Sequence, residues 1–323
     1  MMDRTQTASF LKFNYLLRPS KQVERKLLIE ALHRLSVGGV RVSEYTYLGF
    51  GSIYYADFLL FHKYLYIDKM ICVEAAPIPK RMRFNKPFDR IRLRMTRVSD
   101  VLPTLKRRVK YIVWLDYDYG INEEILQDTA SCLYLLAPGS ILIVTVEAEP
   151  RLPEDRDSEE LTGEERTERL RSMLQEQVGM FVRGKITRRV LTRNSFPRFL
   201  SEVLRAQFSQ EMARRGGVKF LQLFNFRYAD GAQMLTLGGV IADDEVEKQV
   251  SDSGVLDLDF VEAGPEPRII SVPPLTLREK HWLDKRLGQI RKAGDVSFEL
   301  EDELLQNFRR YYRHYPTYYE TLI

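Results

Sequence analysis

Cysteine is scarce in this sequence, with only Cys72 and Cys132 among 323 residues. Both cysteines lie inside apolar runs, where a buried thiol behaves as a small hydrophobic side chain. No cysteines stand in pairs at the spacing that metal sites use. A disulfide scaffold and a cysteine-based zinc module are therefore excluded.

The sequence also lacks long hydrophobic runs. No window approaches the roughly twenty apolar residues that a membrane-spanning helix needs. The N-terminal residues contain no apolar stretch of signal-peptide length, so we expect a cytoplasmic protein that does not contact a membrane. Apolar residues make up 44% of the sequence and charged residues 29%, which is typical of a globular protein with a buried core.

Positive and negative charges are also nearly balanced, with a formal net charge of only +4. The basic residues are nevertheless concentrated in the segment 80–110, at Lys80, Arg81, Arg83, Lys86, Arg90, Arg92, Arg94, Arg97, Lys106, Arg107, Arg108 and Lys110. One interpretation is a surface that binds nucleic-acid phosphates in a salt-dependent way. The other is a solvated face, which the lack of an interleaved aromatic ladder favours.

The most informative stretch is 45–61, which has the pattern of a strand, a glycine turn and a helix. Gly49 and Gly51 lack side chains where the backbone must turn tightly and approach a bound molecule. The following helix offers free backbone N–H groups at the same place, so we predict a ligand pocket here. A plain tight turn is the alternative, because Tyr54 occupies the third glycine position of the dinucleotide-binding fingerprint.

Strand and helix patterns alternate through the first half of the chain. Strands are predicted at about 45–50, 69–74, 90–95, 111–116 and 141–147, and helices at about 20–35, 54–66, 79–84 and 122–136. This alternation predicts a parallel sheet that is covered by helices on both faces.

The amino-acid composition changes in the second half of the chain. Residues from about 150 to 193 are rich in Glu and Arg, which indicates a charged insertion that acts as a lid or as a surface for a protein partner. A helix is predicted from Phe196 to about Ala213, followed by strands at 218–228 and 233–241. Asp-Gly between these two strands predicts a hairpin. The predicted fold class is thus α/β: a Rossmann-like, doubly wound, mostly parallel sheet with a terminal antiparallel hairpin.

Three regions are expected along the chain. Residues 1–43 form an N-terminal helical lead-in, 44–243 form the Rossmann-like core with its insertion, and 244–323 form a linker and a helical C-terminal appendage. Tyr, Arg and His are concentrated at 309–315 in the appendage. This tail either packs onto the core or contacts a protein or RNA.

Acidic residues follow several of the predicted strands. Glu74 ends the second strand, where ligands bind in open α/β sheets and where a carboxylate can accept hydrogen bonds from two ribose hydroxyls. Asp100 opens a helix and is either its cap or a ligand contact at the pocket rim. Asp116 and Asp118 follow the fourth strand. The alternative for Glu74 is an ordinary surface carboxylate at a strand end.

The order of these elements, five strand and helix units followed by a helix and a hairpin, resembles the class I S-adenosylmethionine-dependent methyltransferases. The resemblance covers about 44–243. Within that superfamily the sequence looks most like the poorly characterised O-methyltransferases encoded in bacterial conflict or defence neighbourhoods. The resemblance implies S-adenosylmethionine as the cofactor.

The resemblance also assigns roles to individual residues. It implies that Gly49, Gly51 and Ser52 lie against the methionine part of the cofactor. It implies that Glu74 holds the ribose hydroxyls and that Asp100 contacts the adenine amino group.

Two features depart from the superfamily. The first glycine motif lacks a preceding acidic residue and a third glycine. The Asn/Asp-Pro-Pro-aromatic motif of amino-methylating enzymes is absent, which argues against methylation of DNA base amines.

The resemblance places Asp116, Tyr117 and Asp118 opposite the methyl acceptor. Methyl transfer requires alignment of the nucleophile with the methyl group and removal of a proton. We expect Asp116 or Asp118 to act as the base or to orient the acceptor hydroxyl. The acceptor itself, a small molecule or a macromolecule, is not predicted.

Three alternatives stay open. In the first, Asp116, Asp118, Glu147 and Glu149 place oxygen ligands around Mg²⁺, which binds a diol of the acceptor. In the second, residues 116–118 bind the metal and diphosphate of a nucleotide sugar, and the protein is a metal-dependent transferase. In the third, the protein is a non-catalytic Rossmann-like sensor or interaction module.

Overall fold

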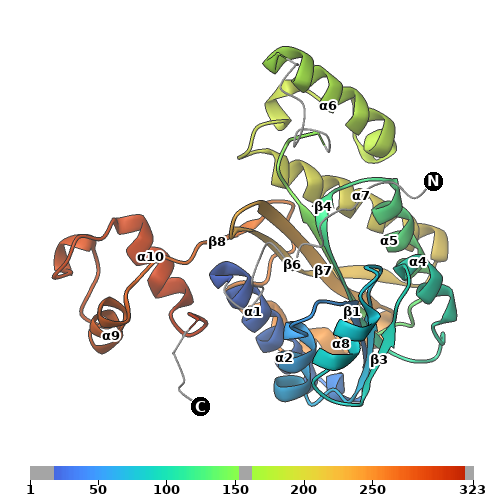
Figure 1. The fold of residues 1–323 in the computed structure, drawn as a ribbon, viewed down its shortest axis with the longest axis horizontal. Helices are drawn as coiled ribbons and strands as arrows, with labels where there is room; N and C mark the ends of the chain where they lie inside the picture. Colours follow the sequence, from blue (N-terminus) through green and yellow to red (C-terminus); the bar gives the residue numbers. More distant parts are fainter. Residues whose placement is uncertain (1–17, 153–161, 317–323) are drawn as a thin grey trace.

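The computed structural model describes residues 18–152 and 162–316, and their centre is one sheet of eight strands in the order β3-β2-β1-β4-β5-β7-β6-β8 (Figure 1). The strands are Thr46–Phe50 (β1), Lys69–Val73 (β2), Ile91–Arg94 (β3), Tyr111–Gly120 (β4), Ile141–Glu147 (β5), Lys219–Ala229 (β6), Gln233–Ala242 (β7) and Arg268–Ile270 (β8). Strands β1 to β5 pair in parallel, and β7 is antiparallel to β5 and β6. The predicted doubly wound, mostly parallel sheet with its antiparallel hairpin is confirmed.

Helices cover both faces of the sheet. The α-helices of the described residues are Pro19–Val37 (α1), Ala56–Leu65 (α2), Pro79–Asn85 (α3), Val98–Val101 (α4), Glu123–Leu135 (α5), Gly163–Val178 (α6), Phe196–Arg215 (α7), Asp244–Asp252 (α8), Leu277–Lys285 (α9) and Asp302–Tyr311 (α10), of which α9 and α10 lie beside the sheet. Helices α1, α2 and α8 share one hydrophobic cluster with the sheet, and α4, α5, α6 and α7 share the other. Figure 1 shows α1 and α2 on one side of the strands and α4 and α5 on the opposite side.

The order of the strands reverses beside β1. The chain passes from β1 to β2 and β3 on one side, and then returns to β4 and β5 on the other side. In doubly wound sheets, such a reversal leaves a crevice at the carboxyl ends of the two strands that flank it. The glycine turn after β1 and the two aspartates of β4 lie at this carboxyl edge.

Helix α1 is anchored at its N-terminus by the β6–β7 hairpin. Arg18 is the N-cap residue but provides no side-chain cap. Instead, the carboxylate of Asp230 in the hairpin turn accepts hydrogen bonds from the backbone N–H groups of Ser20 and Lys21, at 3.0 and 2.8 Å. A carboxylate at this place satisfies free N–H groups and interacts favourably with the helix dipole. The hairpin turn therefore determines where α1 begins relative to the sheet.

The charged insertion and the C-terminal appendage both leave the carboxyl edge. Helix α6 lies in the insertion that follows β5, and the appendage follows β8, which pairs in parallel with β6. Helices α9 and α10 enclose a small core of their own, formed by Leu283, Ile290, Leu305 and Phe308. Figure 1 shows them beside the sheet on the β8 side. The predicted helical appendage is thus present.

Two elements of the C-terminal third are not predicted from the sequence. Helix α8 occupies the segment expected to be a linker, and the side chain of Asp243 caps it by accepting from the N–H of Val246 at 2.9 Å. Strand β8 has only three residues, which is too short for a periodic pattern. It nevertheless extends the sheet by one strand beyond the hairpin.

No helix within 18–152 and 162–316 is both long and apolar enough to cross a lipid bilayer. The cytoplasmic location of the protein stays a prediction.

Replacing Asp230 by Ala should destabilise the protein by about 1–2 kcal/mol, because two backbone N–H groups at the start of α1 lose their acceptor. Urea unfolding followed by circular dichroism measures this change. Asp252→Ala is the matched control, since Asp252 is exposed on α8. An unfolding midpoint of Asp230→Ala equal to that of the control would contradict the anchoring of α1 by the hairpin.

Candidate active site

Gly51 and Glu74 are neighbours at the ends of β1 and β2. The N–H of Gly51 donates to the carbonyl of Val73 at 2.7 Å, which continues the pairing of the two strands by one residue. A Cβ atom on Gly51 would lie 2.9 Å from Cβ of Glu74 and 2.8 Å from Cε of Met82. Only glycine fits here without a shift of its neighbours. The turn after β1 is therefore packed closely against the residue that follows β2.

Gly49 has a different reason to be glycine. A Cβ atom at this position would overlap the hydroxyl of Tyr47. The buried ring of Tyr47 packs edge-on against Phe58 and Phe61 of α2, with ring centroids 5.0 and 4.7 Å away. Gly49 thus makes room for an aromatic contact between β1 and α2, and packing accounts for it without a ligand.

Ser52 and Tyr55 shape the turn that leads into α2. The N–H of Tyr55 donates to the carbonyl of Ser52 at 3.2 Å, and the hydroxyl oxygen of Ser52 accepts from the N–H of Tyr54 at 3.3 Å. Tyr55 has a left-handed backbone with φ of 47°, which is uncommon for a residue other than glycine. Its hydroxyl donates to the carbonyl of Met82 at 2.9 Å. No sequence pattern reveals this conformation, which is typical of binding and catalytic sites.

Glu74 carries a half-buried carboxylate at the centre of this edge. Its Oε1 accepts from the backbone N–H of Ala76 at 2.8 Å. Burial raises the pKa of Glu74, the N–H groups of Ala76 and Ala75 oppose the rise, and the nearby carboxylate of Asp118 adds to it. Strands β2 and β4 both pair in parallel with β1, so their carboxyl ends lie on either side of the end of β1.

Asp116 is paired with a buried lysine from α1. Nζ of Lys21 lies 2.7 Å from Oδ1 of Asp116 and 2.8 Å from Oε2 of Glu24. It also donates to the hydroxyl of Tyr228 at 3.0 Å and lies 4.4 Å from the ring centroid of Trp114. The Lys21 side chain is 0% exposed, so its charge is balanced entirely by these groups.

This pairing determines the ionisation of the aspartate. Burial alone would raise the pKa of Asp116, but the ammonium of Lys21 outweighs burial and holds that pKa below its ordinary value. Burial would lower the pKa of Lys21, but the carboxylates of Asp116 and Glu24 hold it above its ordinary value. Asp116 therefore stays ionised and accepts a proton poorly, which suits a positioning role better than that of a general base.

A second, partly buried ion pair also involves α1. Nε of Arg25 is 2.5 Å from Oδ1 of Asp57, in the first turn of α2. Burial raises the pKa of Tyr47, and the carboxylates of Asp57 and Asp116 raise it further. We call Lys21, Glu24, Arg25, Asp57 and Asp116 the α1 charge cluster. The cluster joins α1 to both β4 and α2.

The sequence pattern does not reveal the α1 charge cluster, because residues 20–35 match an ordinary amphipathic helix. A signal is nevertheless present. Lys21, Glu24 and Arg25 stand three and four positions apart and in line with Leu28 and Leu32, which are buried. Charged residues on the apolar face of a helix indicate buried ion pairs or a site.

Asp118 and Asp100 are both exposed. Asp118 lies two residues beyond Asp116, in the irregular part of β4, and makes no ion pair with the described part of the chain. The carboxylate of Asp100 on α4 accepts from the hydroxyl of Thr96. Arg97, rather than Asp100, is the N-cap residue of α4. The structure thus brings Gly51, Ser52, Glu74 and Asp118 to one edge, with Asp100 at its periphery.

The acidic residues considered for magnesium do not converge. Asp116 is held by the α1 charge cluster, Glu147 is 2.5 Å from Arg151, and Glu149 is 3.1 Å from Arg193. Within the described ranges, no group of three or more His, Cys, Asp or Glu side chains is arranged to hold a metal ion. These residues do not fit a bound magnesium ion, and we assign no step to one.

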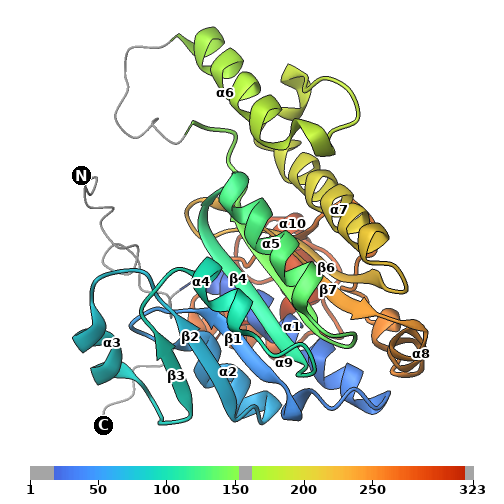
Figure 2. The ribbon, with the colours of Figure 1, turned by 90° about the vertical axis from the view of Figure 1, so that its right-hand side faces the viewer.

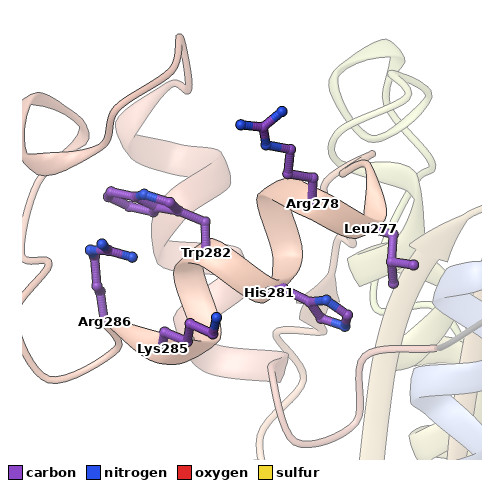
Figure 3. Close-up of a pocket in the computed structure, with 6 residues that line it drawn as sticks. All are labelled: Leu277, Arg278, His281, Trp282, Lys285 and Arg286. Atoms are coloured by element: carbon purple, nitrogen blue, oxygen red, sulfur yellow. The ribbon is translucent and has the colours of Figure 1, made fainter.

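A surface hollow lies away from this edge, along α9 (Figure 3). It is lined by Leu277, Arg278, His281, Trp282, Lys285 and Arg286. In Figure 3 these side chains spread over the outside of one helix. The guanidinium of Arg286 lies 4.5 Å from the ring centroid of Trp282. The hollow belongs to the appendage, so it is not the crevice at the strand reversal.

Comparison with known families gives one match over nearly the whole chain. A family model described as "Putative O-methyltransferase" matches residues 13–323. No curated protein matches the sequence.

Several solved structures are similar to this chain at low identity. One from Klebsiella pneumoniae, described as "a putative O-methyltransferase", is 13% identical, with 72% of this chain and 93% of that chain covered and a TM-score of 0.36. The O-methyltransferase from Bacillus cereus in complex with SAH is 12% identical, with 65% and 80% covered and a TM-score of 0.32. The tomaymycin-synthesis O-methyltransferase from Streptomyces achromogenes in complex with SAM is 14% identical, with 74% and 99% covered and a TM-score of 0.34. TM-scores this low carry no argument about function.

Replacing Lys21 by Met keeps the length of the side chain but leaves the buried Glu24 and the partly buried Asp116 without their ammonium partner. We expect the free energy of unfolding to fall by about 3–5 kcal/mol, measured by urea unfolding. Lys248→Met is the matched control on the exposed surface of α8 and should change stability by less than about 0.5 kcal/mol. If the two variants unfold at the same urea concentration, the buried pair does not hold α1 to β4.

Proposed function

Because the chain belongs to the family described as "Putative O-methyltransferase", we propose that it transfers the methyl group of S-adenosylmethionine to a hydroxyl oxygen of an acceptor. The observation that carries this proposal is the family match over residues 13–323. The strand reversal beside β1 supports it, because sheets of this type bind nucleotide-like ligands at that edge. When bound, S-adenosylmethionine supplies a methyl group already activated by its sulfonium.

Gly51, Ser52 and Glu74 are the proposed cofactor-binding residues. Gly51 lets the turn after β1 pack directly against Glu74, and Ser52 begins the turn into α2. The carboxylate of Glu74 is held by the N–H of Ala76, which leaves acceptor capacity for the two hydroxyls of a ribose. In this proposal Gly49 acts through the packing of Tyr47 rather than through contact with the cofactor.

The two aspartates of β4 have different tasks in this proposal. Asp116 is ionised and bound to Lys21, so it fixes α1 over the sheet. Asp118 is exposed near the carboxyl end of β4, where its carboxylate is available to accept the proton of the attacking hydroxyl. The contact of Asp100 with adenine stays a prediction, as do the cytoplasmic location and a role in bacterial defence.

No specific observation favours the competing classes. A metal-dependent nucleotide-sugar transferase needs converging acidic side chains, whereas Asp116, Glu147 and Glu149 are each paired with a cation of the chain. A non-catalytic sensor differs from an enzyme only in turnover, so binding and methyl transfer must be measured separately.

Isothermal titration with S-adenosylhomocysteine tests the cofactor site. We expect micromolar binding by the full chain and a loss of about 10- to 100-fold in Glu74→Ala, because hydrogen bonds to a charged group disappear. Glu44→Ala is the matched control, since Glu44 is exposed just before β1. Absence of binding by the unmodified chain, with and without magnesium, would rule out the methyltransferase proposal.

We expect Asp118→Asn to change turnover and Asp116→Asn to change stability. Loss of a general base lowers the turnover of Asp118→Asn by about 100-fold or more, with little change in melting temperature. Asp116→Asn should lower the melting temperature, because Lys21 loses its partner. Turnover is measured as transfer of radiolabel from S-adenosylmethionine into the cell-extract fraction that accepts it, and stability is measured by thermal melting. Together the two measurements separate a catalytic effect from a structural one. Full turnover by Asp118→Asn would contradict its role as the base.

A further inference from the structure

The net positive charge of the protein is concentrated in one segment. Residues 80–110 contain twelve Lys and Arg and two Asp, a formal charge of +10, whereas the whole chain carries +4. Folding separates this segment into two parts. Lys106, Arg107, Arg108 and Lys110 immediately precede β4, so they lie at the amino edge of the sheet. The residues of α3 and β3 form the other part, which lies near Gly51 and Glu74 of the candidate site.

We call Lys80, Arg83, Phe84, Arg92, Arg94 and Arg97 the α3–β3 surface. All six side chains are exposed. Within the described ranges, none of the five cations among them is in an ion pair, whereas neighbouring Arg90 is 3.3 Å from Asp68 and Lys86 is 3.2 Å from Asp89. The α3–β3 surface therefore carries positive charge that the described part of the chain does not neutralise.

An exposed aromatic side chain lies on α3, one helical turn beyond Lys80. Phe84 is 89% exposed on α3, next in sequence to Arg83. A single exposed apolar residue is ordinary on a protein surface. An exposed aromatic ring beside unpaired cations, however, provides the two features that single-stranded nucleic acids need: charge for the phosphates and a flat face for an unpaired base.

The α3–β3 surface adjoins the candidate active site. The N–H of Glu74 donates to the carbonyl of Arg94 at 2.9 Å, and Met82 of α3 lies against Gly51. Figure 2 shows α3 beside the edge strand β3. A polymer bound to this surface would pass the carboxyl ends of β2 and β1, where methyl transfer is proposed.

We propose that the α3–β3 surface binds single-stranded RNA and that a ribose 2′-hydroxyl of this RNA is the methyl acceptor. This inference rests on the proposed function, because O-methyl transfer requires a hydroxyl. RNA carries a 2′-hydroxyl on every nucleotide and DNA lacks it. The hydroxyl oxygen bonds to the methyl carbon, and the carbon–sulfur bond breaks with its electron pair passing to sulfur, which gives S-adenosylhomocysteine. The hydroxyl proton passes to the carboxylate of Asp118 and then to water.

Fluorescence anisotropy of the full chain with a labelled, unstructured RNA of about twenty nucleotides tests the surface, over a series of salt concentrations. The variant Lys80→Glu/Arg83→Glu/Arg94→Glu should bind at least about 100-fold more weakly. The slope of log affinity against log salt concentration should be smaller in magnitude by about 2 for this variant, because three phosphate contacts are lost. The matched control is Lys106→Glu/Arg107→Glu/Arg108→Glu, which changes the net charge equally at the opposite edge. It should bind RNA within about threefold of the unmodified chain.

Two further experiments test whether the partner stacks a base on Phe84 and whether it is RNA rather than DNA. Phe84→Ala should weaken binding by about 5- to 100-fold and leave the salt dependence unchanged, because base stacking carries no charge. Radiolabel from S-adenosylmethionine should enter the RNA and not a DNA of the same sequence. Equal loss of RNA binding in the two triple variants would contradict the proposal that the α3–β3 surface binds RNA. Binding of polyglutamate as tightly as RNA would also contradict it. Binding of RNA without label transfer would overturn its role as acceptor.

The cofactor site is measured independently of the RNA surface. The Lys80→Glu/Arg83→Glu/Arg94→Glu variant should bind S-adenosylhomocysteine as the unmodified chain does, and its melting temperature reports that it is folded. If the unmodified chain binds S-adenosylhomocysteine but no RNA, only the RNA inference fails. If it binds RNA but no S-adenosylhomocysteine, the proposed methyl transfer fails.

Discussion

The buried ion pair between Lys21 and Asp116 is the interaction on which the rest of the carboxyl edge depends. A charge with no exposure to solvent must be matched by partners in the fold, so α1 has to lie where Asp116, Glu24 and Tyr228 surround the ammonium. The turn of the β6–β7 hairpin fixes the same helix through Asp230. Helix α1 is thus held at its N-terminal end by β4 and by the hairpin.

This constraint divides the edge into a closed half and an open half. On the closed half lies the α1 charge cluster, in which Lys21 pairs with both Asp116 and Glu24, and Arg25 pairs with Asp57. On the open half, Gly51 and Glu74 are in close contact, and Asp118 is exposed nearby. The half with available acceptors also adjoins the α3–β3 surface, so the cofactor and a large acceptor can approach from the same direction.

The sequence predicts the parts of this architecture that depend on local pattern. Strand β5 matches its predicted range of 141–147, because a continuous apolar run is typical of a buried parallel strand. The proximity of Gly51 and Glu74 follows from the meeting of parallel strands at one edge. The pairing of Asp116 with Lys21 is not predictable in the same way, since the two residues are 95 positions apart and belong to different elements. Gly49 has the pattern of a ligand-binding glycine, yet it accommodates the ring of Tyr47.

A crystal structure of the full chain with S-adenosylhomocysteine tests the central claim most directly. The account predicts the ligand at the carboxyl ends of β1 and β2, with its ribose hydroxyls hydrogen-bonded to Glu74 and its backbone contact at Gly51. It also predicts that the pair of Lys21 and Asp116 is unchanged by the ligand. A ligand bound elsewhere, such as in the hollow along α9, or one that displaces Lys21 from Asp116, would contradict the account.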